Sequence, residues 1–175
     1  MKVYRNGPET ARLMMRAMTP ADAEAFLALN GDPVVMHWTH EPLMISLEEA
    51  RDALESYPDF DTVGYGRWGC ILKESKQLIG FCGLKYLSDL NEIDVGYRFL
   101  PKYWGRGLAT EACGACVNFG FDVMQIDRII GLVLPQNEAS IRVLEKSGLV
   151  LEDEMIFDGL RALRYGIHRD STLLP

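Results

Sequence analysis

The spacing of apolar and polar residues divides the chain into short segments that predict strands and helices in turn. Residues 11–18 are predicted as a first strand, and Thr19-Pro20 supplies the cap and first turn of a helix after it. Ser46 followed by Glu49 is typical of a capping box and predicts the start of a second helix. The segment 30–44 between these helices shows neither period, so we expect irregular structure there.

The middle of the chain predicts an antiparallel meander followed by a crossover helix. Three strands are expected at about 65–73, 77–86 and 91–99, joined by short polar turns. From 108 to 124 the apolar residues recur at helical spacing instead. Residues 128–134 are a continuous apolar run, which is typical of a strand buried on both faces.

The last third predicts one more helix and a hairpin. A helix over 136–147 ends at Gly148, a suitable residue for a left-handed cap. Two strands at about 149–157 and 160–168 flank Asp158-Gly159, a strong signal for a tight hairpin turn. The predicted order is therefore β-α-α-β-β-β-α-β-α-β-β, a mixed α/β (α+β) fold.

Length and composition fit a single domain over 1–175 without linker or repeat. Apolar residues make up 48 % and charged residues 25 % of the 175 positions, an ordinary globular composition. No apolar stretch approaches the roughly 20 residues that span a bilayer. Charged residues interrupt the start of the chain, so we expect no secretory signal, no membrane partner and a cytoplasmic location.

Net charge and cysteine spacing limit which partners and which metal or redox sites we expect. The formal net charge of −7 argues against a nucleic-acid partner and mildly favours a cationic or amine-bearing one. Cys113 and Cys116 have the spacing of a redox motif or half of a zinc site. They fall inside a helical pattern, and Cys70 and Cys82 lie in separate strand patterns. We therefore expect all four as core residues, and no metal site.

The chemically informative stretch is a strand, a glycine-rich turn and a helix over residues 94–111. A helix start presents unpaired backbone N–H groups, and its dipole adds about half a positive charge. Gly105 and Gly107 leave room for a diphosphate to approach the backbone, and Arg106 between them can add a charged donor. The turn therefore predicts a phosphate-binding site.

Four interpretations of this turn compete. A Walker turn requires Lys-Ser/Thr where Leu108 and Ala109 stand, and a dinucleotide fingerprint requires a glycine where Thr110 stands. A coenzyme A turn of the form Arg/Gln-x-x-Gly-x-Gly/Ala matches 104–109 except at its first position. An ordinary loop before a helix is the fourth.

A family resemblance favours coenzyme A. Residues 94–112 resemble the coenzyme A motif of the GNAT acyltransferase superfamily, in the branch of the ribosomal-protein N-terminal alanine acetyltransferases. Residues 137–149 resemble the second motif of that branch, with Leu149 in place of its usual phenylalanine. The opening 10–13 and the order of elements also agree, so the likeness covers nearly the whole chain.

The resemblance implies a mostly antiparallel, seven-stranded sheet with helices on both faces, splayed open between the strands at 91–99 and 128–134. The cofactor lies in that gap, with pantetheine along the first strand and diphosphate on the turn. The implied cofactor-binding residues are Phe99, Leu100, Gly105, Arg106, Gly107, Leu108, Ala109, Thr110, Asn137 and Lys146.

The implied reaction is transfer of an acyl group, in the first place acetyl from acetyl-CoA, to a primary amine that attacks the thioester directly in a ternary complex. The acceptor is a protein N-terminal α-amine or a small amine. Asp94 is the expected base, and its alternative is a structural ion pair with Arg98 on the same strand face. Leu144 stands where many members carry a tyrosine acid, so Ser140 is the expected donor to the thiolate. Its alternative is a bond to the backbone one turn earlier.

The acceptor side carries the weakest signals. Trp38 and Glu92 are expected substrate contacts, and Trp38 lies with His37 and His40 in the loop where acceptors bind in relatives. Ordinary loop and core roles are the alternative for these three residues. A non-catalytic acyl-CoA sensor is the alternative function, and a homodimer is an alternative to a monomer.

Overall fold

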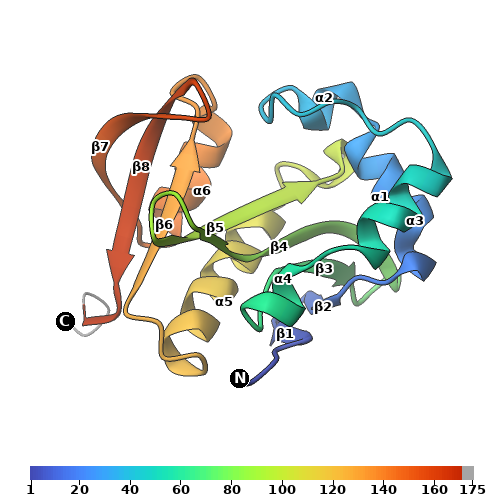
Figure 1. Cartoon of the computed structure of the whole chain (residues 1–175), viewed down its shortest axis with the longest axis horizontal. Coiled ribbons are helices and arrows are strands. Elements are labelled where there is room, and N and C mark those ends of the chain that lie inside the picture. The colour runs from blue at the N-terminus through green and yellow to red at the C-terminus, as the bar shows by residue number, and fades with distance from the viewer. Residues whose placement is uncertain (171–175) are drawn as a thin grey trace.

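The computed structural model describes residues 1–170, which form one eight-stranded sheet in the order β1-β2-β3-β4-β5-β6-β8-β7 (Figure 1). Every neighbouring pair is antiparallel except β5 and β6. The mixed, mostly antiparallel fold is therefore confirmed. The strands are β1 Asn6–Glu9, β2 Leu13–Ala17, β3 Arg67–Leu72, β4 Gln77–Leu87, β5 Glu92–Phe99, β6 Arg128–Val133, β7 Val150–Phe157 and β8 Leu160–His168.

The predicted strand count of seven is wrong by one, because β1 was not predicted. This strand pairs with β2 at the edge of the sheet. Its sequence, Asn-Gly-Pro-Glu, has no apolar alternation and consists entirely of residue types that are depleted in strands. Short edge strands tolerate proline and need no apolar face, so the periodicity carried no signal for it.

Helices cover both faces of the sheet, as expected. Figure 1 shows α5 and α6 on one face and α1 and α3 on the other. The helices are α1 Ala23–Asn30, α2 Pro33–Met36, α3 Leu47–Glu55, α4 Asp59–Thr62, α5 Leu108–Asp122 and α6 Glu138–Lys146, with 3₁₀ turns at Pro20–Asp22 and Pro101–Tyr103. The single-turn helices α2 and α4 were not predicted. Within residues 1–170, no helix is both long enough and apolar enough to span a membrane.

The residues predicted to cap helices or form turns mostly do so in the structure. The Ser46 hydroxyl accepts from the Glu49 N–H at 3.1 Å, while the Glu49 carboxylate accepts from the Ile45 N–H at 2.9 Å, one residue earlier than in a standard capping box. Gly148 follows α6 with φ +91°, the left-handed cap expected there. Asp158 and Gly159 have φ of 49° and 75°, as a tight hairpin turn between β7 and β8 requires.

The main core lies between the sheet and α5. Its largest fully buried side chains include Trp68 on β3 and Ile129 on β6. The Trp68 indole N–H donates to the Tyr4 carbonyl at 2.8 Å, so its polar atom is satisfied inside the core. All four cysteines are free and buried, which confirms their predicted role as core residues.

The parallel pair β5–β6 opens the sheet. It has a single register pair, Asp94 with Ile130, whereas β4 and β5 pair along the whole of β5. Beyond Asp94 the two strands diverge, as Figure 1 shows. The splay expected between these strands is therefore present, and it creates the cavity described below.

Two isoleucines provide a test of this core. Ile129 is fully buried on β6, whereas Ile45 before α3 is 87 % exposed. Ile129→Ala should lower the free energy of unfolding by about 2–5 kcal/mol, because it removes buried methyl groups and leaves a cavity. Ile45→Ala should change it by less than about 0.5 kcal/mol. Urea denaturation of both variants measures the difference; equal effects would contradict this assignment of the core.

Candidate active site

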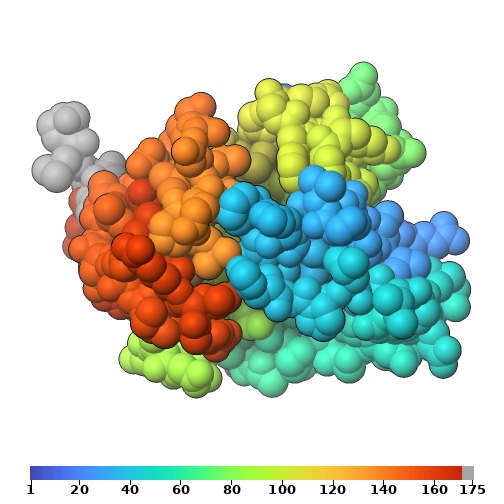
Figure 2. Space-filling view, turned by 90° about the horizontal axis from the view of Figure 1, so that it is seen from above, coloured from blue at the N-terminus to red at the C-terminus, as the bar shows by residue number. Residues whose placement is uncertain are grey.

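A cavity of about 840 Å³ occupies the opening between β5 and β6. One wall comes from α6 and the β7–β8 hairpin, and the other from α1, the α2–α3 loop and α3. The floor is β5, and the turn before α5 closes one end. Figure 2 looks onto the face where the blue-to-cyan segment lies opposite the orange-to-red one. The cavity thus draws on segments far apart in the sequence.

The turn at residues 105–107 owes its glycines to backbone conformation. Gly105 and Gly107 have φ of 72° and 74°, and Gly107 is the cap residue of α5. A Cβ atom on Gly105 would meet nothing within 4 Å, so it is the left-handed φ that favours glycine there. The first N–H groups of α5, from Gly107 to Thr110, have no partner within the helix. Those of Leu108, Ala109 and Thr110 belong to residues that line the cavity.

A network that the sequence analysis missed supports this turn from behind. Glu111, in the first turn of α5, accepts from the Thr10 hydroxyl at 2.6 Å, the Arg12 N–H at 3.0 Å and the Arg12 Nε at 2.6 Å. Arg12 Nη1 also donates to the Arg106 carbonyl at 2.9 Å. The β1–β2 turn therefore holds both the helix start and the peptide between the two glycines. The resemblance of residues 10–13 was the only sequence signal for this role.

Eight of the ten expected cofactor residues line the cavity: Phe99, Gly105, Gly107, Leu108, Ala109, Thr110, Asn137 and Lys146. Leu100 and Arg106 are not among the lining residues. The Leu100 N–H donates to the Ile79 carbonyl at 3.0 Å, and its carbonyl accepts from the Tyr103 N–H at 2.9 Å. Both its backbone groups are therefore in use. Arg106 is exposed at the rim, with its guanidinium carbon 5.8 Å from the centre of the Tyr103 ring.

The open edge of β5 presents backbone groups to the cavity. The Leu100 N–H bonds to Ile79 at the end of the β4–β5 pair. In an antiparallel pair, successive residues direct their backbone N–H and C=O groups alternately toward the partner strand and away from it. Tyr97 and Phe99 therefore direct theirs away from β4, toward the splay. The Phe99 carbonyl accepts from the Trp104 indole N–H at 2.6 Å. The N–H groups of Tyr97 and Phe99 are thus directed at any extended chain lying beside β5.

Asp94 lies on β5 where β5 and β6 part, and it bonds to both β6 and β3. Its Oδ1 accepts from the Leu132 N–H of β6 at 3.1 Å, and its Oδ2 pairs with Arg67 Nη2 of β3 at 2.6 Å. The alternative partner, Arg98, is wrong: it bonds to Asn30 and Glu41 instead. Asp94 is 8 % exposed and lines the cavity. It is therefore both a structural link and an ionisable group inside the site.

Arg67 was not predicted, and paired glycines explain its place. Gly83 and Gly96 are register partners on β4 and β5, and a Cβ on Gly96 would lie 2.5 Å from Arg67 Nη2. The Arg67 guanidinium fills the space at Gly96, whereas a Cβ on Gly83 would meet the backbone of Gly66 and Arg67. The guanidinium also donates to the Gly83 and Asp94 carbonyls. Glycines on neighbouring central strands were the signal that a long side chain crosses there.

Burial sets the ionisation of Asp94. Removal from water raises the pKa of Asp94 above its ordinary value, against the opposing effects of the Arg67 guanidinium and the Leu132 N–H. Burial lowers the pKa of Arg67, but the charge and hydrogen bond of the same carboxylate outweigh this and raise it, so Arg67 stays charged. A carboxylate with a raised pKa binds a proton more readily than an exposed aspartate does.

The second motif forms the wall opposite β5. Asn137 caps α6, with its side-chain oxygen accepting from the Ser140 N–H at 3.2 Å. Ser140 lines the cavity, and its carbonyl accepts from the Tyr97 hydroxyl at 3.0 Å. Among the bonds within residues 1–170, none joins the Ser140 hydroxyl to the backbone one turn earlier, the alternative considered for it. Leu144 is buried on the same helix.

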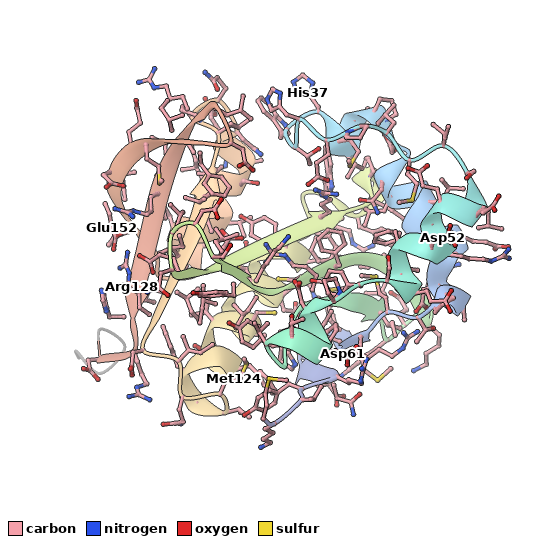
Figure 3. All side chains as sticks on the ribbon, viewed as in Figure 1. His37, Asp52, Asp61, Met124, Arg128 and Glu152 are labelled. Atoms are coloured by element: carbon pink, nitrogen blue, oxygen red, sulfur yellow. The ribbon has the colours of Figure 1, made fainter. Side chains whose placement is uncertain are left out.

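The two expected acceptor contacts lie in different places. Trp38 lines the cavity, is 37 % exposed and packs edge-on against His37, with ring centres 4.6 Å apart. Figure 3 shows His37 at the top of the view and Arg128 near Glu152 at the left, on β6 and β7. Glu92 bonds to Arg128 Nε at 3.1 Å, and Arg128 in turn pairs with Glu152. Glu92 is not among the residues that line the cavity, so it is not retained as a substrate contact.

These elements define what the site can do. A helix start offers N–H groups to an anion, the edge of β5 offers N–H groups to an extended chain, and a buried carboxylate lies where the strands part. Lys146 and Arg142 add positive charge from α6, and both line the cavity. Within residues 1–170, no three metal-binding side chains cluster.

The Glu111 network can be tested by its effect on stability. Burial raises its pKa, but the bonds from Thr10 and Arg12 outweigh this and lower the pKa of Glu111. A lowered folded pKa stabilises the protein above the ordinary glutamate pKa, and this stabilisation is lost as pH falls through the folded value. Glu111→Gln should therefore lower the free energy of unfolding by about 1–3 kcal/mol at pH 7, and by less in acid. Denaturant unfolding against pH measures this, with the exposed Glu74→Gln as control; a pH-independent cost would contradict it.

Comparison with known proteins agrees with this geometry. Residues 12–150 match the model of the acetyltransferase (GNAT) domain. The Bacillus subtilis (strain 168) protein described as uncharacterized N-acetyltransferase YoaA is 34 % identical over 147 residues, 82 % of each chain. A GNAT-family acetyltransferase structure from Bacillus anthracis superposes with a TM-score of 0.79 at 27 % identity, covering 93 % of this chain and 98 % of that one.

A more distant structure shares the fold. Spermidine N-acetyltransferase from Vibrio cholerae, in complex with CoA and spermine, superposes with a TM-score of 0.77 at 20 % identity, over 94 % of this chain and all of that one. The domain match covers most of the chain, and the relatives carry the name N-acetyltransferase. The chain therefore belongs to the GNAT acetyltransferase family and is an N-acetyltransferase.

Proposed function

We propose that this N-acetyltransferase uses acetyl-CoA as donor and a primary amine as acceptor, by direct attack of the amine on the thioester in a ternary complex. The observation that carries the proposal is the open parallel pair β5–β6 ending at the amide-rich start of α5. A protein N-terminal α-amine or a small amine is the acceptor. The non-catalytic sensor is not favoured, because the relatives are named as transferases.

The donor is proposed to lie along the opening. Its diphosphate takes the N–H groups of residues 107–110, with Arg106 at the rim and Lys146 on α6 adding positive charge. Pantetheine runs beside β5, where it meets the N–H groups of Tyr97 and Phe99 in place of the Leu100 group expected from the sequence. Asn137 holds the arm from the α6 side. One of the β5 N–H groups then faces the thioester oxygen and stabilises the oxyanion.

Asp94 is proposed as the group that removes the proton from the incoming ammonium. Each carboxylate oxygen can accept more than one hydrogen bond, so Asp94 can bind an ammonium or a water while it keeps Arg67 and Leu132. Its raised pKa makes it a stronger proton acceptor than an ordinary aspartate. Because the base acts unprotonated, its contribution to turnover is lost as pH falls through this raised pKa.

Ser140 is proposed as the donor to the departing thiolate. It lies at the start of α6, one turn after the Asn137 cap, and lines the cavity. Thiols have an ordinary pKa near 8.5, so the thiolate requires only modest help. The Tyr97 hydroxyl donates to the Ser140 carbonyl, which fixes this residue against β5. Trp38 is proposed to contact the acceptor from the opposite wall.

Arg106 offers a test of donor binding. Arg106→Ala should weaken CoA binding by about threefold to tenfold, the range for an exposed charge that contacts a phosphate. Calorimetric titration with CoA measures the affinity. Lys102→Ala is the matched control, since Lys102 is also exposed and also lies over the Tyr103 ring, at 5.0 Å. Unaltered affinity in Arg106→Ala would contradict the placement of the diphosphate.

Asp94 offers a test of the base. Asp94→Asn should lower kcat by about 100-fold or more, the scale of general-base catalysis, with a smaller effect on CoA affinity. This variant also leaves Arg67 buried without its counter-charge, which destabilises the fold by itself.

The double variant Arg67→Met/Asp94→Asn separates these effects, because it removes both charges. A purely structural Asp94 predicts that the double variant regains stability and turnover together. A base predicts that stability returns while turnover stays low. Thermal unfolding and free-thiol release measure the two quantities, and recovery of turnover would contradict the base role.

A further inference from the structure

A second guanidinium lies on the acceptor side of the cavity. Arg98 follows Asp94 and Gly96 on the same face of β5, and its side chain is 18 % exposed. Its guanidinium carbon lies 5.4 Å from the centre of the Phe81 ring. Arg98 lines the cavity together with Phe26, Val35, Trp38 and Phe81. A positive charge therefore lies in a mostly apolar pocket, beside the strand where the amine must attack.

One side of the Arg98 guanidinium is fixed from within the fold. Its Nη1 donates to the Asn30 side-chain oxygen at 2.6 Å, and Asn30 is only 4 % exposed. Asn30 is itself oriented, because its side-chain N–H donates to the Phe26 carbonyl of α1 at 3.0 Å. The guanidinium is thus aimed before any ligand arrives.

The other side of Arg98 is held by an exposed residue. Its Nη2 donates to Glu41 Oε2 at 2.7 Å, and the Glu41 side chain is 58 % exposed on the loop between α2 and α3. An exposed ion pair on a loop contributes little stability. By contrast, Arg67 is paired with the buried Asp94. Compared with Arg67, Arg98 has a counter-charge that a ligand can replace without opening the core.

The charge of Arg98 constrains the acceptor. An amine approaches mainly as an ammonium. An acceptor that displaces Glu41 leaves the Arg98 guanidinium without its counter-charge, and this guanidinium repels an ammonium unless the acceptor carries a negative group of its own. A carboxylate of the acceptor, bound in the position of the Glu41 carboxylate, keeps a charge-assisted hydrogen bond to Arg98. Its two oxygens match the paired N–H donors of the planar guanidinium. The apolar lining suits an apolar body between the two charged groups.

We propose that the acceptor is an amino-carboxylate, a small molecule with a primary amine, a carboxylate and an apolar body, such as an apolar amino acid. Arg98 binds its carboxylate in place of Glu41, and the ammonium gives a proton to Asp94. The amine nitrogen then bonds to the acetyl carbon, the carbon–sulfur bond breaks, and the second amine proton ends on the CoA thiol. This inference rests on the proposed function and narrows its acceptor.

Matched acceptors test the proposal. Phenylalanine and leucine are compared with the amines that lack only their carboxylate, 2-phenylethylamine and 3-methylbutylamine, and with 6-aminohexanoate and spermidine. Free-thiol release from acetyl-CoA gives kcat/KM for each. An amino-carboxylate should exceed its decarboxylated partner by about tenfold or more, the value of one charge-assisted bond. Spermidine should be a poor acceptor.

Variants assign the preference to Arg98. Arg98→Met should abolish the carboxylate preference, and Arg98→Lys should keep part of it, because lysine keeps the charge but loses the fork. Glu41→Gln should lower KM for amino-carboxylates by removing the competing carboxylate. Glu48→Gln, on the exposed first turn of α3, should change nothing. CoA affinity and thermal unfolding report whether each variant is folded.

The outcomes separate this inference from the proposed function. If spermidine or one of the amines without a carboxylate is acetylated best and Arg98→Met leaves that order unchanged, the amino-carboxylate is overturned while the N-acetyltransferase stands. The same conclusion follows if no amino-carboxylate is acetylated or binds the CoA complex by calorimetry. Failure to bind CoA at all would instead overturn the proposed donor site.

Discussion

The site depends on the single register pair that joins β5 to β6. Parallel strands with only one paired position must diverge beyond it. The hydrogen bond from the Leu132 N–H to the Asp94 carboxylate fixes the point of divergence. On one side of this point the sheet is continuous and packed against α5. On the other side, β5 retains an unpaired edge that would be costly to bury without a partner. The opening of the sheet and the unpaired edge of β5 therefore have the same cause.

Local chemistry made much of this architecture predictable. The change from alternation to helical spacing at Leu108, the cap at Ser46 and the turn at Asp158-Gly159 each depend on a few adjacent residues, and all appear in the structure. The turn at residues 105–107 was informative for the same reason, since two residues with left-handed φ and a helix start lie within a few positions. The splay itself was expected only from the family resemblance.

Features that depend on distant residues were missed. Arg67 and Asp94 are 27 positions apart, and Thr10 and Glu111 are 101 apart, so no local period relates them. Arg98 was the alternative partner considered for Asp94 because both share a strand face, but β3 lies close enough to offer a better-placed guanidinium over Gly96. Glu92 shares that face too, yet its position at the start of β5 directs it to Arg128. Strand alternation gives the face of a residue and not its partner.

The bonds that converge on Glu111 have a thermodynamic consequence. They connect the start of α5 to the β1–β2 turn at the outer edge of the sheet, and Arg12 reaches the peptide between the two glycines. Detachment of that edge would leave the turn unsupported, so a molecule bound at the turn and the docked edge stabilise each other to the same extent. Binding at the helix start and docking of the first two strands are therefore thermodynamically coupled in this fold.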